Sequence, residues 1–431
     1  AWFVRHFLSR YSSANNHLIG ELTGLWVACS VFDLGEKGAS WAAQAQQELE
    51  HEAMLQVYAD GVNKEQACYY HLWVLEYFMF AWLVGVRSQQ GFSAAFRERI
   101  LAMSGFLHAV TPLGGEPPQI GDADDGFVTR FNVAWPKNAY SDVLASVDAV
   151  FGIGAELLPQ KAFWYALSAG KIPGVVKPAK LDSKTYPVVF SEGGYAVLGN
   201  SLVHLVFDAG ALGYPSIAAH GHADALNVCL ALDGAWWLVD PGTYAYHSDH
   251  GWRDYFRGTA AHNTLLIDGI NQSEIGGPFL WTQHAHARLL GAGRDAHGNQ
   301  WAEGEHDGYK RIAGMHSRRI ELDETAGEIT ISDEVQGVSE HELSVHFHFA
   351  PDIELIQGED SGTWLAIKPD TARKLLVTVD QSWHWEILRG SESPMLGWYS
   401  SALGMKEPTA TLRGVWQGRL PIRLLTKVLV S

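Results

Sequence analysis

Three side chains in the second half of the chain are of the types that bind a divalent metal ion. His222 lies in the segment HGHAD, Asp240 ends the apolar run AWWLVD, and His262 lies in RGTAAHNT. Imidazole nitrogens and carboxylate oxygens are common zinc ligands. Adjacent strands could bring the three together, although no compact ligand motif requires a metal site. The alternative is that these side chains form hydrogen bonds between loops across a sheet.

His220 precedes His222 by two residues and has the chemistry of a general acid or base near neutral pH. On a regular strand the two imidazoles would face the same side. Gly221 between them permits a bend, so the two side chains could serve different tasks.

A second polar group, in the segment NNHLIGE at residues 15–21, opens an apolar helical run. Asparagine is a favoured N-cap, so Asn15 or Asn16 could simply cap this helix. In the functional interpretation, Asn16 and His17 project into a cleft at the helix start. Glu21 lies one turn after His17 and could orient its imidazole.

A third group, EQACYYH at residues 65–71, stands at the head of another apolar helical run. A tyrosine at such a place usually packs in the core, and a catalytic role requires a depressed pKa or a proton relay. From the residues alone the packing role of Tyr69 and Tyr70 is favoured. The acidic segment GDADDG at 121–126 lacks the final glutamate of an EF-hand loop and predicts a turn between helices with solvated carboxylates.

Helical and strand patterns divide the chain into an α+β multidomain protein. Apolar spacing predicts helices at 16–32, 68–86 and 92–109, and a run of strong helix formers after Ser40 predicts another. Prolines mark 171–187 as a linker, after which short alternating segments predict strands, including a hairpin in VVFSEGGYAVLGN. We therefore predict a partial α/α toroid at 1–172, an antiparallel β domain at 185–345 and a C-terminal β-sheet region at 346–431.

The composition restricts the class of ligand. The chain has 431 residues and a formal net charge of −17, which argues against non-specific binding of nucleic acid. An acidic glycan stays possible, because a cleft can carry its own local charge. No apolar run of transmembrane length occurs. The three cysteines (Cys29, Cys68 and Cys229) lie in apolar segments and are expected to be buried free thiols.

Together these segments resemble the heparinase II/III-like family of polysaccharide lyases. The resemblance rests on HGHAD at 220–224, VDPGTY at 239–244, RDYFRGTAAHNT at 253–264, NNHLIGE, EQACYYH and EHDGY at 305–309. It implies a helical toroid followed by antiparallel sheets. Members normally have a longer helical region ahead of the Asn-His motif, so the chain is predicted to be a fragment, a processed product or an unusually short toroid.

The resemblance also implies residue roles. Asn16 binds and neutralises the uronate carboxylate, and His17 either shares this task or is a catalytic base. Tyr70 is the catalytic tyrosine, and His220 is the second acid/base residue. His222, Asp240 and His262 form a structural metal site, with zinc as the expected ion. Further substrate contacts are expected from Glu21, Tyr244, Arg253, Arg257, His306 and Tyr309, although the arginines could equally form salt bridges within a sheet.

The implied reaction is β-elimination on an acidic polysaccharide such as heparin, heparan sulfate, hyaluronan or chondroitin, and the implied location is periplasmic or secreted. Three alternatives remain open at this point. The substrate could be alginate or another polyuronate, the protein could be a glycan-binding protein without catalysis, or the metal could serve a hydrolase. The presence of Asn16, His17, Tyr70 and His220 together favours the enzyme over the binding protein.

Overall fold

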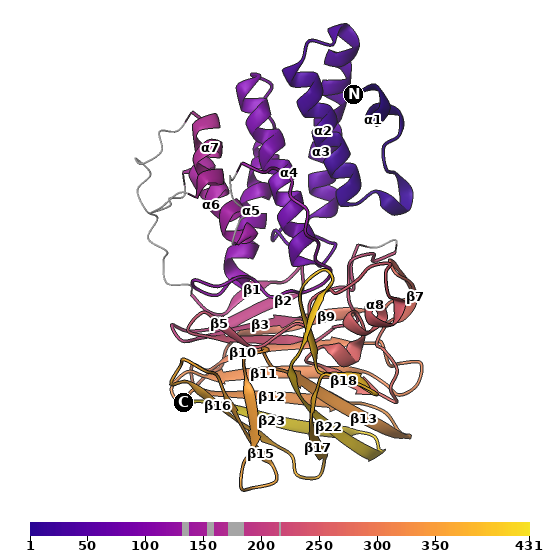
Figure 1. The fold of residues 1–431 in the computed structure, drawn as a ribbon, viewed down its shortest axis with the longest axis vertical. Helices are drawn as coiled ribbons and strands as arrows, with labels where there is room; N and C mark the ends of the chain where they lie inside the picture. The colour runs from indigo at the N-terminus through magenta and orange to yellow at the C-terminus, as the bar shows by residue number, and fades with distance from the viewer. Residues whose placement is uncertain (132–137, 153–158, 171–184, 215–216) are drawn as a thin grey trace. The chain divides into compact units, whose positions relative to one another are not determined.

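The computed structural model describes residues 1–131, 138–152, 159–170, 185–214 and 217–431 (Figure 1). Most of the predicted linker, 171–184, lies outside these residues. The chain divides into two compact units: a helical unit of residues 1–111 and 126–183, and a β unit of residues 112–125 and 184–431. The predicted α+β organisation, helices first and antiparallel sheets after, is confirmed.

The helical unit is built from packed α-helices. Its helices are α1 (Trp2–His6), α2 (Asn16–Val31), α3 (Gly35–Gln56), α4 (Cys68–Arg87), α5 (Ala94–Val110), α6 (Ala139–Phe151) and α7 (Gln160–Ser168), with a 3-10 turn at Tyr11–Ser13. Three of these helices begin at a residue whose side chain caps the first turn: Asn15, Ser93 and Asn138. Helix α3 begins five residues earlier than the predicted start at Ser40, and Glu36 lies in its first turn, where a negative charge is favourable.

The interior of the helical unit is apolar, with a few buried polar ties. Helices α2, α3 and α4 pack through fully buried side chains such as Leu22 and Leu49. The indole of Trp26 on α2 donates a hydrogen bond to the carbonyl of Ala81 on α4 (3.0 Å). A buried ion pair joins Lys161 on α7 to Glu76 on α4 (2.6 Å).

The β unit is built from antiparallel sheets. A five-stranded sheet has the order β1 (Val188–Phe190), β2 (Tyr195–Gly199), β3 (Val203–Asp208), β4 (Val228–Leu232), β5 (Ala235–Leu238). An eight-stranded sheet has the order β14 (Glu354–Gln357), β15 (Thr363–Ile367), β16 (Lys374–Val379), β23 (Ile422–Val430), β12 (Glu328–Val335), β11 (His316–Asp323), β10 (Gln300–His306), β9 (Ala287–Arg294). A four-stranded sheet has the order β17 (His384–Arg389), β22 (Ala410–Arg419), β13 (Glu340–His348), β6 (Leu265–Ile267).

Short hairpins and one helix complete the β unit. The hairpins are β7 (Glu274–Gly277) with β8 (Leu280–Gln283), β18 (Ser391–Glu392) with β19 (Met395–Leu396), and β20 (Trp398–Ala402) with β21 (Met405–Pro408). Helix α8 (His250–Phe256) and a 3-10 turn at Thr259–Ala261 lie in the loop before β6. The predicted hairpin in VVFSEGGYAVLGN is the pair β1–β2.

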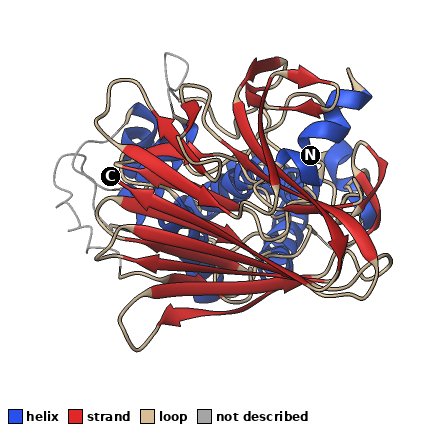
Figure 2. Cartoon of the chain, turned by 90° about the horizontal axis from the view of Figure 1, so that it is seen from below, coloured by secondary structure: helices blue, strands red, loops and turns tan. Residues whose placement is uncertain are grey.

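One continuous core joins the sheets, and the long strands lie side by side in Figure 2. It contains, for example, Leu205 of β3, Ile331 of β12 and Leu412 of β22. The last strand, β23, pairs with β12 along its length. Strand β13 also continues across the predicted domain boundary between residues 345 and 346. The C-terminal strands are therefore part of the same sheets, and the separate region predicted from residue 346 is not seen, because strand pairing links it to the preceding residues.

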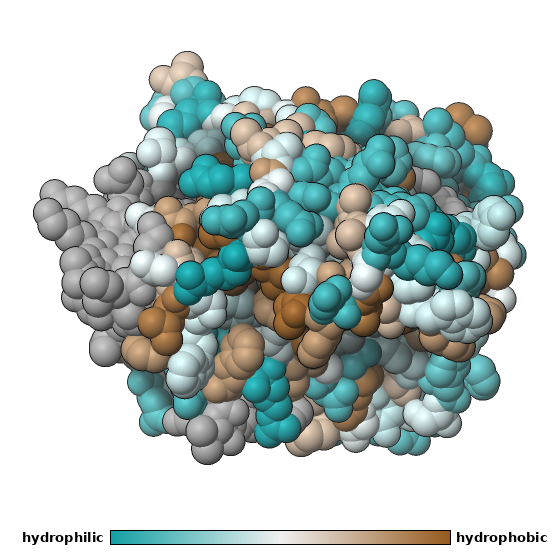
Figure 3. All heavy atoms as spheres, turned by 90° about the horizontal axis from the view of Figure 1, so that it is seen from above, coloured by the Kyte–Doolittle hydropathy of each residue, from teal (hydrophilic) through white to brown (hydrophobic). Residues whose placement is uncertain are grey.

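Hydrophilic side chains predominate on the face drawn in Figure 3, with smaller hydrophobic groups between them. Among the described residues, no helix combines the length and the apolar character that crossing a membrane requires. The three cysteines are buried and free, as expected.

Candidate functional site

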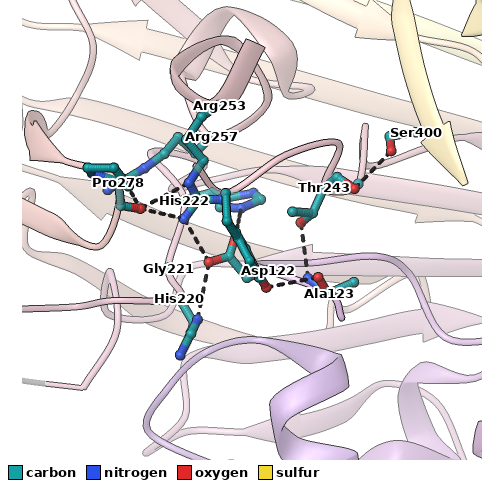
Figure 4. Close-up of polar contacts among 12 residues, drawn as sticks. Asp122, Ala123, His220, Gly221, His222, Thr243, Arg253, Arg257, Pro278 and Ser400 are labelled. Carbon is teal, nitrogen blue, oxygen red and sulfur yellow. Dashed lines mark hydrogen bonds and ion pairs between the residues drawn. The ribbon is translucent and has the colours of Figure 1, made fainter. Parts of the chain in front are cut away.

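A single buried carboxylate organises the polar centre of the β unit. Asp122 is 0% exposed and receives hydrogen bonds from three side chains (Figure 4). His220 donates from Nδ1 to Oδ2 (3.2 Å), His222 donates from Nε2 to Oδ1 (3.0 Å), and Arg253 contacts both carboxylate oxygens. The segment 112–125 thus belongs to the β unit, and its aspartate is not a solvated turn residue as predicted.

The backbone of the HGH segment brings both imidazoles to this carboxylate. The amide of Asp122 donates to the carbonyl of His220 (2.9 Å), which aligns the two segments. A Cβ at Gly221 would lie 1.5 Å from the carbonyl oxygen of Leu212, so only glycine fits between the two histidines. The two imidazoles reach different oxygens of one carboxylate.

Charge keeps Asp122 ionised in this interior. Burial by itself would raise the pKa of its carboxyl group, but the Arg253 charge and the hydrogen bonds from His220, His222 and Arg253 together hold that pKa well below its usual value. An ionised acceptor makes stronger hydrogen bonds than a neutral one. Asp122 is therefore able to fix the orientation of both imidazole rings.

The three predicted metal ligands lie together. One ligand atom from each of His222, Asp240 and His262 falls within 4.8 Å of the others. His222 Nδ1 lies 3.3 Å from His262 Nε2, and His262 Nε2 lies 3.7 Å from an Asp240 carboxylate oxygen. Tetrahedral coordination with zinc–ligand bonds of about 2.1 Å separates ligand atoms by about 3.4 Å, so the spacing fits.

The outer hydrogen bonds of the two imidazoles also fit a metal ion. His222 donates from Nε2 to Asp122, and His262 donates from Nδ1 to the carbonyl of Gly258 (2.9 Å). The two nitrogens that face each other then both carry a lone pair, an arrangement that a cation stabilises. Burial raises the pKa of Asp240 well above its usual value, and a divalent cation would supply the charge that keeps this carboxylate ionised.

Two asparagines hold the metal-ligand candidates in place. Asn227 donates from its side chain to Asp240 (3.0 Å), and its own side-chain oxygen accepts from the amide of Asn263. The side chain of Asn263 donates to the carbonyls of Val228 and Val239, which braces the strands on either side. Neither asparagine was predicted from the sequence to have a role.

In the helical unit, Asn15 caps helix α2, and Asn16 is held by Glu65. Asn15 accepts a hydrogen bond from the amide of His17 (3.2 Å), so the cap does not use Asn16. The backbone amide and the side-chain Nδ2 of Asn16 both donate to the Glu65 carboxylate, at 3.0 and 2.8 Å. Glu65 thereby sets the orientation of the Asn16 amide, and His17 beside it is exposed.

The other predicted residues of this unit lie as follows. Tyr70 is in the first turn of α4, 4% exposed, with its ring against Trp73. His71, next to it, donates from Nε2 to the carbonyl of Met103 (3.0 Å). Glu21 does not orient His17 as expected, because Ser9 engages both of its carboxylate oxygens, at 2.5 and 2.7 Å.

Four of the predicted substrate contacts lie in the interior of the β unit. Arg253 pairs with Asp122 and also donates to the carbonyl of Pro278, and Arg257 donates to carbonyls of the β7–β8 turn and lies over the ring of Trp281 (4.1 Å). His306 and Tyr309 are 0% exposed. This burial argues against direct contact with a substrate.

His306 and Tyr309, which belong to the motif EHDGY, make structural contacts inside the β unit. His306 lies 3.0 Å from His316, whose other nitrogen donates to Asp333 (2.7 Å), and Tyr309 donates from its hydroxyl to the carbonyl of Leu265 (3.0 Å). These bonds tie strands and loops together. Tyr244, by contrast, is half-buried.

Comparison with known sequences identifies the family. Residues 183–426 match the sequence model described as Heparinase II/III-like, C-terminal, and residues 3–136 match the model described as Heparinase II/III N-terminus. The chain belongs to the heparinase II/III-like family. The matched regions contain the Asp122 cluster and the three metal-ligand candidates. Asp122 itself lies in the range of the N-terminal match but folds with the β unit.

Individual heparinase relatives agree with this assignment. The chain is 23% identical over 298 residues to a heparin-sulfate lyase of Bacteroides thetaiotaomicron, which covers 65% of this chain and 40% of the relative. A heparinase III structure aligns with 99% of this chain and 61% of its own (TM-score 0.76, 18% identity). Heparan sulfate lyase HepC from Pedobacter heparinus aligns with the same shares (TM-score 0.73, 16% identity). The chain therefore has the heparinase III fold and spans less than two thirds of the length of these relatives.

Proposed function

We propose that this protein is a polysaccharide lyase that cleaves a uronic-acid-containing glycosaminoglycan by β-elimination. The observation that carries the proposal is the setting of His220. Its imidazole is held through Nδ1 by the buried, ionised carboxylate of Asp122, so a proton transfer by His220 uses Nε2. Family membership and the heparin-sulfate lyase relative support the same activity.

The elimination requires one base and one acid. The base removes the proton on C5 of the uronate, the electrons of that C–H bond form the C4–C5 double bond, and the bond from C4 to the glycosidic oxygen breaks. The departing oxygen takes a proton from the acid. We assign these two proton transfers to Tyr70 and His220, with His220 as the base when Tyr70 is the acid.

The uronate carboxylate must be stabilised while C5 loses its proton, because negative charge moves onto it. We assign this task to Asn16 and His17. The two hydrogen bonds from Asn16 to Glu65 support the assignment, since they hold the amide in one orientation before a substrate binds. Preorganised donors are favourable because they need little rearrangement during the reaction.

We further propose that His222, Asp240 and His262 hold a structural zinc ion. Such an ion would contribute stability to the loops around His220. A hydrolytic metal needs an open coordination position beside a cleft. The three side chains are 1%, 2% and 0% exposed, respectively, which favours a structural ion over the metallohydrolase considered above.

The test is a spectrophotometric assay on a panel of glycans. Purified protein is mixed with heparin, heparan sulfate, hyaluronan, chondroitin sulfate or alginate, and the unsaturated uronate product is followed at about 232 nm. We expect absorbance to rise with a glycosaminoglycan and the rise to disappear in Tyr70→Phe. Tyr309→Phe serves as a matched control, because Tyr309 is buried in the β unit and bonded to a backbone carbonyl.

The outcomes separate the alternatives. A rise with alginate alone would move the assignment to a polyuronate lyase of the same architecture. Binding of a glycan with no rise for any of them, from folded and metal-loaded protein, would favour a glycan-binding protein and overturn the proposal. The predicted periplasmic or secreted location stays a prediction.

A further inference from the structure

A lysine of the β unit is held among three aromatic rings. The Lys406 ammonium lies 4.0 Å from the ring centroid of Trp252, 4.2 Å from that of Trp398 and 5.4 Å from that of Tyr244. The two indoles meet edge to face, with centroids 5.2 Å apart. We call these four residues the Lys406 cage. All four residues are half-buried, so the cage reaches the surface of the β unit, and the rings hold the ammonium in place.

No acidic residue of the described part of the chain neutralises the charge of Lys406. Among the residues that the structure describes, no carboxylate lies within ion-pair distance of its ammonium group. Other lysines of the same unit are paired, as Lys368 is with Asp352 and Lys427 with Glu328. Aromatic faces attract the cation but do not use up its three N–H donors. The cage therefore presents an oriented cation that can still donate to an anion.

The cage is attached to the framework that supports His220. Lys406 and Trp398 belong to the hairpin β20–β21, in which Ser400 donates to the carbonyl of Thr243 (2.9 Å). The hydroxyl of Thr243 in turn accepts from the amide of Ala123, next to Asp122 (3.0 Å; Figure 4). Substrate bound through His220 would thus lie on the same scaffold as this hairpin.

We propose that the Lys406 cage is a binding subsite for an anionic group, a carboxylate or a sulfate, on a sugar of the glycan. The inference rests on the proposed function and adds the subsite to it. A lysine immobilised by three rings loses less side-chain entropy on binding than a free surface lysine does. The cage thereby offers a preorganised cation in a chain whose net charge would otherwise repel an acidic glycan.

The test compares Lys406→Met with Lys406→Arg, which retains the positive charge. Heparin and chemically desulfated heparin are the probes. We expect Lys406→Met to raise KM about 3- to 10-fold with little change in kcat, the loss expected for one charge-assisted hydrogen bond in a partly exposed site. Lys406→Arg should give a KM between those of the wild type and Lys406→Met, because it keeps the charge while its larger planar guanidinium does not match the place of the ammonium among the rings. Lys427→Met is the matched control, because that lysine lies on β23 outside the cage.

Direct binding separates this proposal from the proposed activity. Dissociation constants for the two probes are measured by calorimetry in the Tyr70→Phe background, where the glycan is not consumed, or in the wild type if it cleaves no glycan. If Lys406→Met weakens the binding of heparin but not of desulfated heparin, the subsite binds a sulfate. If it weakens the binding of both probes equally, the subsite binds a carboxylate. Unchanged dissociation constants would overturn the proposal.

A structural role for the cage is tested by thermal unfolding. If Lys406→Met unfolds before assay, Lys406→Gln takes its place. A lower melting temperature with unchanged binding would show that the lysine only fastens the hairpin, and would also overturn the subsite.

Discussion

Replacement of Asp122 by asparagine tests the central feature of the β unit. The substitution preserves the shape of the side chain but removes the charge that faces Arg253, which is itself 0% exposed. Breaking a buried ion pair costs about 3 to 5 kcal/mol. Arg253 retains its hydrogen bonds to the carbonyl of Pro278, so we expect the lower end, about 3 kcal/mol. For a unit of this size that lowers the melting temperature by about 6 to 12 °C.

Asp122→Asn should also impair the two histidines. An asparagine has one acceptor oxygen, so it can receive a hydrogen bond from His220 or from His222 but not from both as Asp122 does. Loss of such an outer hydrogen bond typically costs about 10- to 100-fold in metal affinity or activity. We therefore expect either kcat or the bound metal, measured by mass spectrometry, to fall by about that factor, according to whether His220 or His222 loses its acceptor.

A double variant separates stability from positioning. Asp122→Asn combined with Arg253→Met removes both charges, so more than half of the lost stability should return. The quantity that fell in Asp122→Asn should stay low, because the single acceptor oxygen of the asparagine still cannot serve both imidazoles. Recovery of that quantity together with the melting temperature would refute the reasoning and show that Asp122 acts only by stabilising the fold.

Three further predictions concern single side chains. His262→Ala should lose the bound metal. When the free metal concentration is a thousand times the dissociation constant of the wild type, the variant should also be less stable than the wild type by about 4 kcal/mol, measured by calorimetry. Unchanged stability would contradict a structural ion. Glu65→Gln should lower kcat about tenfold by releasing Asn16, with a melting temperature near that of the wild type; a change in KM alone would argue against the orienting role. Burial lowers the pKa of His71 in the folded protein to about 4. As the pH falls, the histidine is therefore protonated in the unfolded chain before it is protonated in the folded one. The free energy of unfolding is unaffected by this group above pH 6.5 and decreases as the pH falls from 6.5 toward 4. Thermal unfolding should show that the free energy of unfolding falls by about 2 kcal/mol between pH 6.5 and 5, and that it falls less in His71→Gln. The same pH dependence in the wild type and the variant would contradict this prediction.

Local patterns in the sequence were sufficient to predict much of the fold. Apolar residues at helical spacing predicted α2, α4 and α5 to within two residues at either end, because burial of one helix face is a short-range property of the chain. The hairpin β1–β2 followed in the same way from alternation around a glycine turn. The residue types and order of His222, Asp240 and His262 were sufficient to suggest a metal site, and the structure brings these side chains together.

The role of Asp122 could only be decided by the tertiary structure. Its segment has the glycines and acidic residues of an exposed turn, yet its partners His220 and Arg253 are 98 and 131 residues away in the chain. Which long-range groups meet depends on how segments pair, and neither local propensity nor composition specifies that. For the same reason Arg253, Arg257, His306 and Tyr309 were predicted as substrate contacts, whereas the sheets bury them. The sequence determined which chemical groups are present and which elements carry them, and the packing of the sheets decided which of these groups are charged, bonded or accessible.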